Sequence, residues 1–146
     1  MKLADLKIFI LIFTSISFAN TPSHSQQVLQ YEPHIVTLTG ILGTRIYPGP
    51  PNYESIKSGD RAERIWHVKL KRPFTVVGDL DPTSQNEKET GIREIQLIVI
   101  SDKLGENLRK HMGATILFRG TLTHAITGHH HLPILMEVKS FVVQKE

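Results

Sequence analysis

The chain has 146 residues, about the length of one domain, and 40% of them are hydrophobic while 7% are aromatic, which is an ordinary composition for a globular protein. Its formal net charge of +3 is too small to indicate nucleic-acid binding by bulk electrostatics. The sequence contains no Cys, which excludes disulfide bonds, thiolate metal ligands and cysteine nucleophiles.

The N-terminal segment has the pattern of a secretory signal peptide. Lysines precede an apolar stretch from residue 8 to 16, which is too short to span a bilayer. Small residues, Ser17 and Ala19, then suit the positions before a cleavage site. We therefore expect residues 1–19 to be removed on export, leaving a periplasmic or secreted protein with no membrane anchor in the mature chain.

The next segment, residues 20–33, is polar and contains Pro and Gln. A segment of this composition buries little apolar surface, so we expect a flexible leader. We place the folded domain at residues 34–146.

From His34 onward, apolar and β-branched residues recur at every second position, which predicts strands. In the first strand Val36, Leu38 and Leu42 share one face, and in the fourth Phe118 lies on the inward face. The predicted strands are five in number, at about residues 34–46, 66–77, 92–100, 115–125 and 134–143.

One short helix is predicted between the third and fourth strands. Ser101 or Asp102 can cap its N-terminus, and apolar residues recur at helical spacing from Leu104 to Met112. Gly113 follows where a left-handed C-cap is needed.

This order of elements selects the fold class. Five strands with one helix between the third and fourth are typical of the OB-fold, a small barrel, and Gly40 and Gly120 would permit the bends that close it. A β-sandwich usually needs about seven strands. We therefore predict an all-β domain with one short helix, built as a five-stranded OB-like barrel.

The connection between the first two strands is rich in Pro and should be stiff, because Pro restricts φ. In an OB-fold it flanks the usual binding face, together with the connection between strands four and five. Tyr53, Glu54 and Ser55 in this loop are therefore candidate ligand-binding residues. A structural role, in which Tyr53 and Ile56 cover the end of the barrel, stays open.

Three adjacent histidines, His129, His130 and His131, lie between the fourth and fifth strands and are also candidate ligand-binding residues. Imidazole is a common ligand of Zn²⁺, and His129 and His131 would point the same way in an extended segment. A zinc site needs three or four protein ligands, which this spacing alone does not supply. Hydrogen bonds from the imidazoles to backbone carbonyls of the Pro-rich loop are the structural alternative. We expect at least one of the three within hydrogen-bonding distance of residues 48–60.

Three phrases of the sequence together resemble the hallmarks of an uncharacterised family of exported bacterial domains. They are Gly-Pro-Pro-Asn-Tyr-Glu-Ser-Ile at 49–56, Gly-Ala-Thr-Ile-Leu-Phe-Arg-Gly-Thr-Leu at 113–122 and Thr-Gly-His-His-His at 127–131. The resemblance covers about residues 34–143. It implies that these form one domain and that the two loops matter, but it brings no activity, cofactor or site residue.

No catalytic template is present: the sequence has no Gly-x-Ser-x-Gly, no His-Glu-x-x-His and no Gly-rich phosphate loop. OB-folds that bind single strands use exposed aromatic side chains, whereas Trp66 falls on the predicted inward face, so we expect no nucleic-acid partner. We expect a non-enzymatic binding module without a cofactor, which holds a protein or a small envelope ligand between its two loops, although an enzymatic activity is left open. The alternative is a zinc- or copper-binding protein, or a metal-dependent enzyme, centred on His129 and His131.

Overall fold

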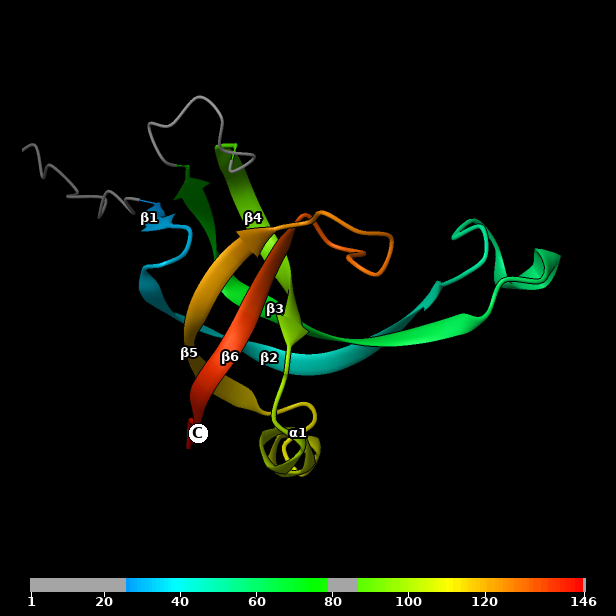
Figure 1. The fold of residues 1–146 in the computed structure, drawn as a ribbon. Coiled ribbons are helices and arrows are strands. Elements are labelled where there is room, and N and C mark those ends of the chain that lie inside the picture. Colours follow the sequence, from blue (N-terminus) through cyan, green and yellow to red (C-terminus); the bar gives the residue numbers. More distant parts are fainter. Residues whose placement is uncertain (1–25, 79–86, 146) are drawn as a thin grey trace, which may run out of the picture.

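The structure is a computed structural model that describes residues 26–78 and 87–145, so the expected signal peptide at 1–19 lies outside the described residues. The described chain is mostly strand, with one α-helix and one short 3-10 helix (Figure 1). No helix among these residues is long and apolar enough to cross a membrane. The elements are β1 (Gln27–Gln30), β2 (Ile35–Pro48), η1 (Ile56–Ser58), β3 (Ala62–Val77), β4 (Glu89–Ile98), α1 (Asp102–Arg109), β5 (Thr115–His124) and β6 (Ile134–Val143).

The described residues form six strands, and the prediction of five was wrong. The additional strand, β1, lies within residues 20–33, which we expected to be a flexible leader. It pairs in parallel with β3 from Phe74 to Val77, and Tyr31, which follows it, is only 2% exposed in the core. Folded structure therefore begins before His34. A polar segment can join a sheet because its backbone supplies the hydrogen bonds, and one aromatic ring supplies the buried contact.

All six strands belong to one sheet, in the order β1-β3-β2-β5-β6-β4, with a further pairing between β3 and β4. The neighbours β2–β3, β2–β5, β3–β4 and β5–β6 are antiparallel, whereas β4 and β6 are parallel. Hydrogen bonding thus passes from β3 through β2, β5, β6 and β4 and returns to β3, which makes a closed ring of strand pairs.

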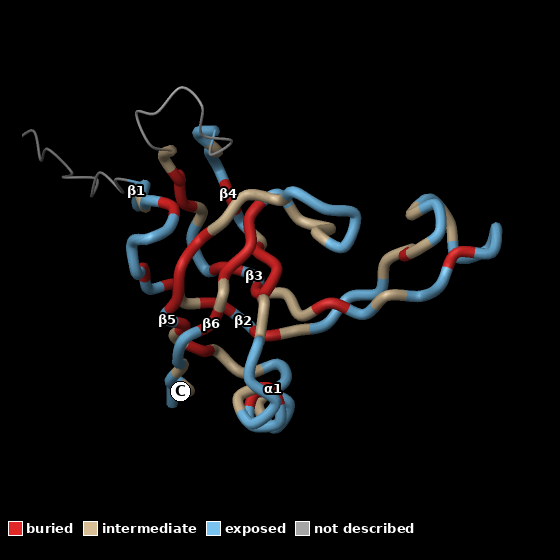
Figure 2. Tube along the Cα trace, in the orientation of Figure 1, coloured by how far each residue is buried: buried red, intermediate tan, exposed pale blue. Residues whose placement is uncertain are grey.

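The strand faces predicted to be apolar line the core. Val36, Leu38 and Leu42 of β2 are buried, and Phe118 of β5 is 0% exposed. Figure 2 shows the buried segments gathered where the strands cross, with α1 mostly exposed at one end. Each large apolar side chain buried in this way stabilises the fold by about 1.5–3 kcal/mol relative to an exposed one. The inward placement predicted for these four residues is confirmed.

The helix is shorter than predicted. The Ser101 side chain accepts a hydrogen bond from the Leu104 N–H at 3.4 Å, but α1 ends at Arg109, so that Met112 lies beyond it and is 43% exposed. The chain turns there because Gly113, with φ of +79°, donates its N–H to the Leu42 carbonyl of β2. This backbone contact redirects the chain into β5.

The strands β2 and β3 are longer than predicted and continue beyond the ring as a two-stranded arm (Figure 1). The Pro-rich connection, residues 49–61, forms the tip of the arm. Along one face of the arm, Tyr47 lies opposite Glu63 and Gly43 lies opposite His67. Side chains at these paired positions point to the same face of the sheet.

Candidate functional site

A single carboxylate organises the Pro-rich loop at the tip of the arm. Asp60 is 5% exposed, and its oxygens accept the backbone N–H groups of Ser55, Asn52 and Glu54 at 2.8–2.9 Å. The hydrogen bonds from Ser55 and Asn52 in particular hold the pKa of Asp60 below its ordinary value. Sequence reasoning missed Asp60, although an Asp within a Pro-rich turn commonly accepts local backbone N–H groups.

The same loop presents the ring of Tyr53 to the His-rich loop, residues 125–133. Tyr53 has φ of +60°, in the left-handed region that few residues other than glycine adopt, and its N–H donates to the Gly49 carbonyl at 3.0 Å. A Cβ on Gly128 would lie 2.9 Å from Tyr53 Cζ. A side chain at position 128 would therefore displace the tyrosine ring, whereas glycine lets the His-rich loop pack directly on it.

Glu63 joins the two loops. Its Oε1 lies 2.6 Å from His129 Nδ1 and its Oε2 lies 2.8 Å from His131 Nε2, so one carboxylate accepts hydrogen bonds from two imidazoles. On the far side of the first imidazole, the Tyr53 hydroxyl lies 3.2 Å from His129 Nε2. When His129 is neutral and carries its proton on Nδ1, the phenol can donate to Nε2. We call these four residues, Tyr53, Glu63, His129 and His131, the Glu63 cluster.

Gln96 of β4 anchors the backbone of the His-rich loop to the sheet. Its side chain is buried, donates to the His129 carbonyl at 2.9 Å and accepts the His131 N–H at 2.8 Å. The His131 ring also stacks on Tyr47, with centroids 4.6 Å apart and planes 7° from parallel. These contacts leave the His131 side chain 8% exposed, whereas that of His129 is 58% exposed.

The expected contact between the histidines and residues 48–60 is confirmed by the hydrogen bond from Tyr53 to His129. The physical reason that we gave was wrong. The imidazoles of His129 and His131 bind the Glu63 carboxylate instead of backbone carbonyls, because an ionised carboxylate is the stronger acceptor.

The remaining candidate residues take no part in the Glu63 cluster. Glu54 and Ser55 contribute backbone N–H groups to Asp60. His130 turns back on its own loop, where Nδ1 accepts the Ile126 N–H at 3.0 Å. Sequence reasoning missed Glu63 and Gln96, because a single Glu and a single Gln within strands carry no local signal of their partners.

The charges of the cluster follow from its hydrogen bonds. Desolvation alone would raise the pKa of Glu63, but hydrogen bonds from His131 and His129 outweigh it and hold the pKa below its ordinary value. Burial, followed by the nearby charges of His129 and His131, lowers the pKa of His130. At neutral pH the carboxylate is therefore ionised and His130 is neutral.

A second polar group lies on the same strand face. Arg45 makes a bidentate ion pair with Glu94, with N–O distances of 2.9 and 3.0 Å. His67 packs on Gly43, where a Cβ would lie 2.7 Å from its Nε2. Its Nδ1 is buried and has no hydrogen-bond partner among the described residues. Burial and then the charge of Arg45 lower the pKa of His67.

The described part of the chain places no group of three or more His, Asp or Glu as ligands of a metal ion. Glu63, His129 and His131 are the donor types that Zn²⁺ accepts. Each imidazole nitrogen, however, is hydrogen-bonded directly to a different oxygen of the carboxylate. A metal could enter only if those hydrogen bonds were replaced.

Comparison with known proteins identifies one similarity. Residues 94–141 match the family described as "Domain of unknown function (DUF4431)". The matched segment contains Gln96, His129 and His131, whereas Tyr53 and Glu63 lie outside it. No curated protein and no solved structure matches the chain.

Proposed function

We propose that this chain is a non-enzymatic binding protein that holds a protein or a small ligand of the cell envelope on the surface formed by the arm tip and the His-rich loop. The observation that carries the proposal is the Glu63 cluster, which links Tyr53 at the arm tip to His129 and His131 in the other loop. Loops held on a rigid strand scaffold are a common site of binding function.

The strand pairings support the proposal that the fold is an OB-like barrel. Its ring of strands would be β2, β3, β4, β6 and β5, with α1 between β4 and β5 along the chain. In an OB-fold the ligand face lies on the second and third strands, between two flanking loops. The corresponding parts here are β3, β4 and the connections 49–61 and 125–133, which are the elements that bear the Glu63 cluster and Gln96.

The chemistry of the exposed groups fits such a ligand. The His129 imidazole is 58% exposed and offers hydrogen bonding. Ile56 on the arm tip and Ile126 in the His-rich loop are 44% and 69% exposed. A surface that combines apolar and hydrogen-bonding groups suits a protein or an amphiphilic small molecule.

Export to the periplasm or the medium is part of the proposal and rests on the signal-peptide pattern of residues 1–19. Mass spectrometry of the exported protein is expected to show a chain that begins at Asn20. An exported protein with an intact Met1 would contradict this part of the proposal.

Photo-crosslinking in the exporting cells tests the binding surface. A photoreactive residue at Ile56 or Ile126 is expected to give a specific adduct, whereas the same residue at Val28, which is 61% exposed in β1, serves as the control. Glu63→Gln should weaken the adducts at both loop positions, because it loosens the contact between the loops. Equal crosslinking at all three positions, or adducts that Glu63→Gln leaves unchanged, would count against the proposed surface.

Binding of zinc or copper, alone or as part of a metal-dependent enzyme, is the second candidate. It is favoured by the convergence of His129 and His131 on one carboxylate, that of Glu63. These three residues would hold the metal after their mutual hydrogen bonds were replaced. Metal analysis of the untagged protein after separate incubations with zinc and with copper tests this. One equivalent of either metal that is lost in His129→Ala and His131→Ala supports a site, and a protein that stays metal-free in both incubations excludes it.

A further inference from the structure

One edge of β6 is left unpaired by the other described strands. Pairing with β5 extends along β6, but the parallel pairing with β4 covers only Leu135–Glu137. β4 ends at Ile98 and the chain turns into α1. On the side away from β5, residues 138–143 therefore have no strand partner within the described parts of the chain. An unpaired edge presents backbone groups that can pair with another strand.

The register identifies the free backbone groups. The Gln144 N–H donates to the Thr115 carbonyl of β5. Successive residues of an antiparallel strand direct their N–H and C=O groups to alternate sides. Phe141 and Val143 therefore direct theirs away from β5, whereas Val142, between them, directs its groups toward β5.

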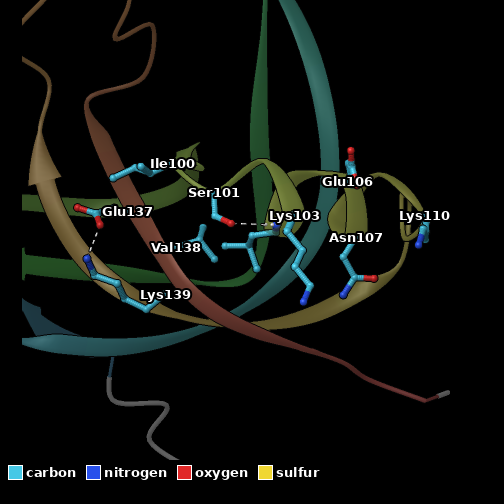
Figure 3. A pocket seen from close by; sticks show the side chains of 10 residues that line it. Ile100, Ser101, Lys103, Glu106, Asn107, Lys110, Glu137, Val138 and Lys139 are labelled. Carbon is cyan, nitrogen blue, oxygen red and sulfur yellow. Dashed lines mark hydrogen bonds and ion pairs between the residues drawn. The ribbon is translucent and has the colours of Figure 1, made fainter.

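The first residues of the free edge, Val138 and Lys139, line a groove between β6 and α1 (Figure 3). The groove has a volume of about 850 Å³. Val138 of β6 and Leu104 of α1 contribute apolar surface, and Ile100, also in its lining, is 72% exposed. A strand that enters this groove would bury apolar side chains while its backbone reaches the edge of β6.

The charge of the groove indicates the character of its occupant. Lys103 and Lys110 line it from α1, and the ion pairs of the described residues include neither. Lys139 is neutralised by Glu137. In Figure 3 the Lys103 side chain points from α1 toward β6, whereas the Glu106 carboxylate points away from it. The unpaired positive charges on the helix favour an acidic occupant.

We propose that an extended acidic segment of a partner protein binds in this groove as an added strand of the sheet, beside residues 138–143. The segment lies on the side of β6 where β4 would continue if β4 did not end at Ile98. Main-chain hydrogen bonds to Phe141 and Val143 hold the segment, and its carboxylates lie near Lys103 and Lys110. Addition of a strand to a sheet edge is an established mode of peptide recognition. This site is separate from the Glu63 cluster and does not depend on the function proposed there.

Peptide titration followed by amide hydrogen exchange tests the proposal on the mature full-length chain. The probe is a synthetic octapeptide of alternating Val and Glu. At saturation the exchange rates of the Phe141 and Val143 amide protons should fall at least about tenfold. The Val142 amide should change little, because it already bonds to β5. The Val142 amide is therefore an internal control in the same strand.

Two matched peptides and two variants complete the experiment. A peptide with Lys in place of Glu, and the acidic peptide with alternate backbone amides N-methylated, should each bind at least about tenfold more weakly. Lys103→Glu combined with Lys110→Glu should weaken binding of the acidic peptide by a similar factor. Lys57→Glu at the arm tip, which reverses one charge away from the groove, should leave that binding unchanged.

The other outcomes overturn the proposal. If the N-methylated peptide binds as well as its parent, the contact is made by side chains and no strand is added. If the amides of Phe141 and Val143 become protected as the protein concentration rises without peptide, a second copy of the chain occupies the edge. If none of the peptides binds, the groove does not accept an extended acidic segment.

Discussion

Glu63 determines whether the two loops of the candidate site stay together. Its carboxylate receives hydrogen bonds from His129 and His131, and no second carboxylate in the cluster can replace it. A Gln at this position has one acceptor oxygen, and its NH₂ group would face the N–H of one imidazole. The neutral amide also loses the charge that strengthens both hydrogen bonds.

We therefore expect Glu63→Gln to lower the free energy of unfolding by about 1 kcal/mol, a modest value because the side chain is partly exposed to solvent. NMR signals of the His-rich loop should broaden at the same time. Urea unfolding measures the first effect, and Glu54→Gln, at an exposed position outside the cluster, should stay within about 0.5 kcal/mol of the parent protein.

The same comparison has a defined pH dependence. Because the pKa of Glu63 is lowered in the folded protein, its contribution is complete above the ordinary pKa of Glu, about 4.3, and disappears as the pH falls through the lowered value. The stabilities of the parent and Glu63→Gln should therefore converge in acid. A difference that persists at the lowest pH would assign the effect to packing.

His67 predicts a second pH dependence, closer to neutrality. Burial lowers the pKa of His67 below 6.5, so the unfolded chain binds a proton more readily than the folded one. The contribution of neutral His67 to the free energy of unfolding is therefore fully present above the ordinary pKa of His and falls as the pH drops below that value. Between about pH 7 and pH 5, His67→Phe should lose less stability than the parent in urea unfolding. Parallel curves for the two proteins would show that His67 is not the source.

At the scale of elements, β1 and the residue that follows it decide where the fold begins. Tyr31 is 2% exposed and its hydroxyl donates to the Glu87 carbonyl at 3.0 Å. Burial, with the charges of Glu89 and Glu87, raises the pKa of this phenol to about 12. The short strand thus brings a large aromatic side chain into the core.

We expect Tyr31→Ala to destabilise the protein by about 3–5 kcal/mol, the range for removal of a buried aromatic side chain. A chain that starts at Glu32 should lose this amount together with the pairing of β1. Val28→Ala, at a position that is 61% exposed in the same strand, is the control and should have little effect. If the chain starting at Glu32 is as stable in urea as one starting at Gln26, β1 contributes nothing to the fold.

At the scale of the whole molecule, the ring of strand pairs depends on two close approaches of backbone. A Cβ on Gly120 would overlap the Glu137 carbonyl oxygen of β6, and a Cβ on Gly40 would overlap Val68 and Lys69 of β3. The obstacle is partly backbone in both cases, so a change of rotamer cannot relieve it.

Gly120→Ala should therefore destabilise the protein by about 3 kcal/mol or more, because β5 and β6 must move apart. Gly105→Ala is the matched control. The nearest atom to its new Cβ would be Val99 Cγ1 at 3.7 Å, and Ala is favoured over Gly within a helix by up to about 1 kcal/mol. Thermal unfolding of the two variants should separate them clearly. Similar transitions would mean that the ring tolerates a wider spacing.

Local patterns in the sequence predicted much of the fold. Alternation of apolar residues identified the inward faces of β2 and β5, including Leu38 and Phe118, because side chains along a strand point to opposite sides in turn. The cap predicted at Ser101 or Asp102, which the structure assigns to Ser101, and the left-handed glycine at 113 marked the ends of the helical region, although α1 itself stops at Arg109. Each of these signals lies within a few residues of the feature that it predicts.

Tertiary structure alone decided the features that depend on distant partners. β1 forms because residues 74–77 of β3 lie beside it, and its own composition carries no such signal. Glu63 meets His129 and His131 across more than 60 positions of sequence, so neither residue type nor spacing could pair them. Strand register brings such residues together, and a buried or charged group then takes the best partner within reach. The sequence by itself therefore determined which strand faces are buried and where the two connecting loops lie along the chain, and the assembled sheet decided which side chains meet.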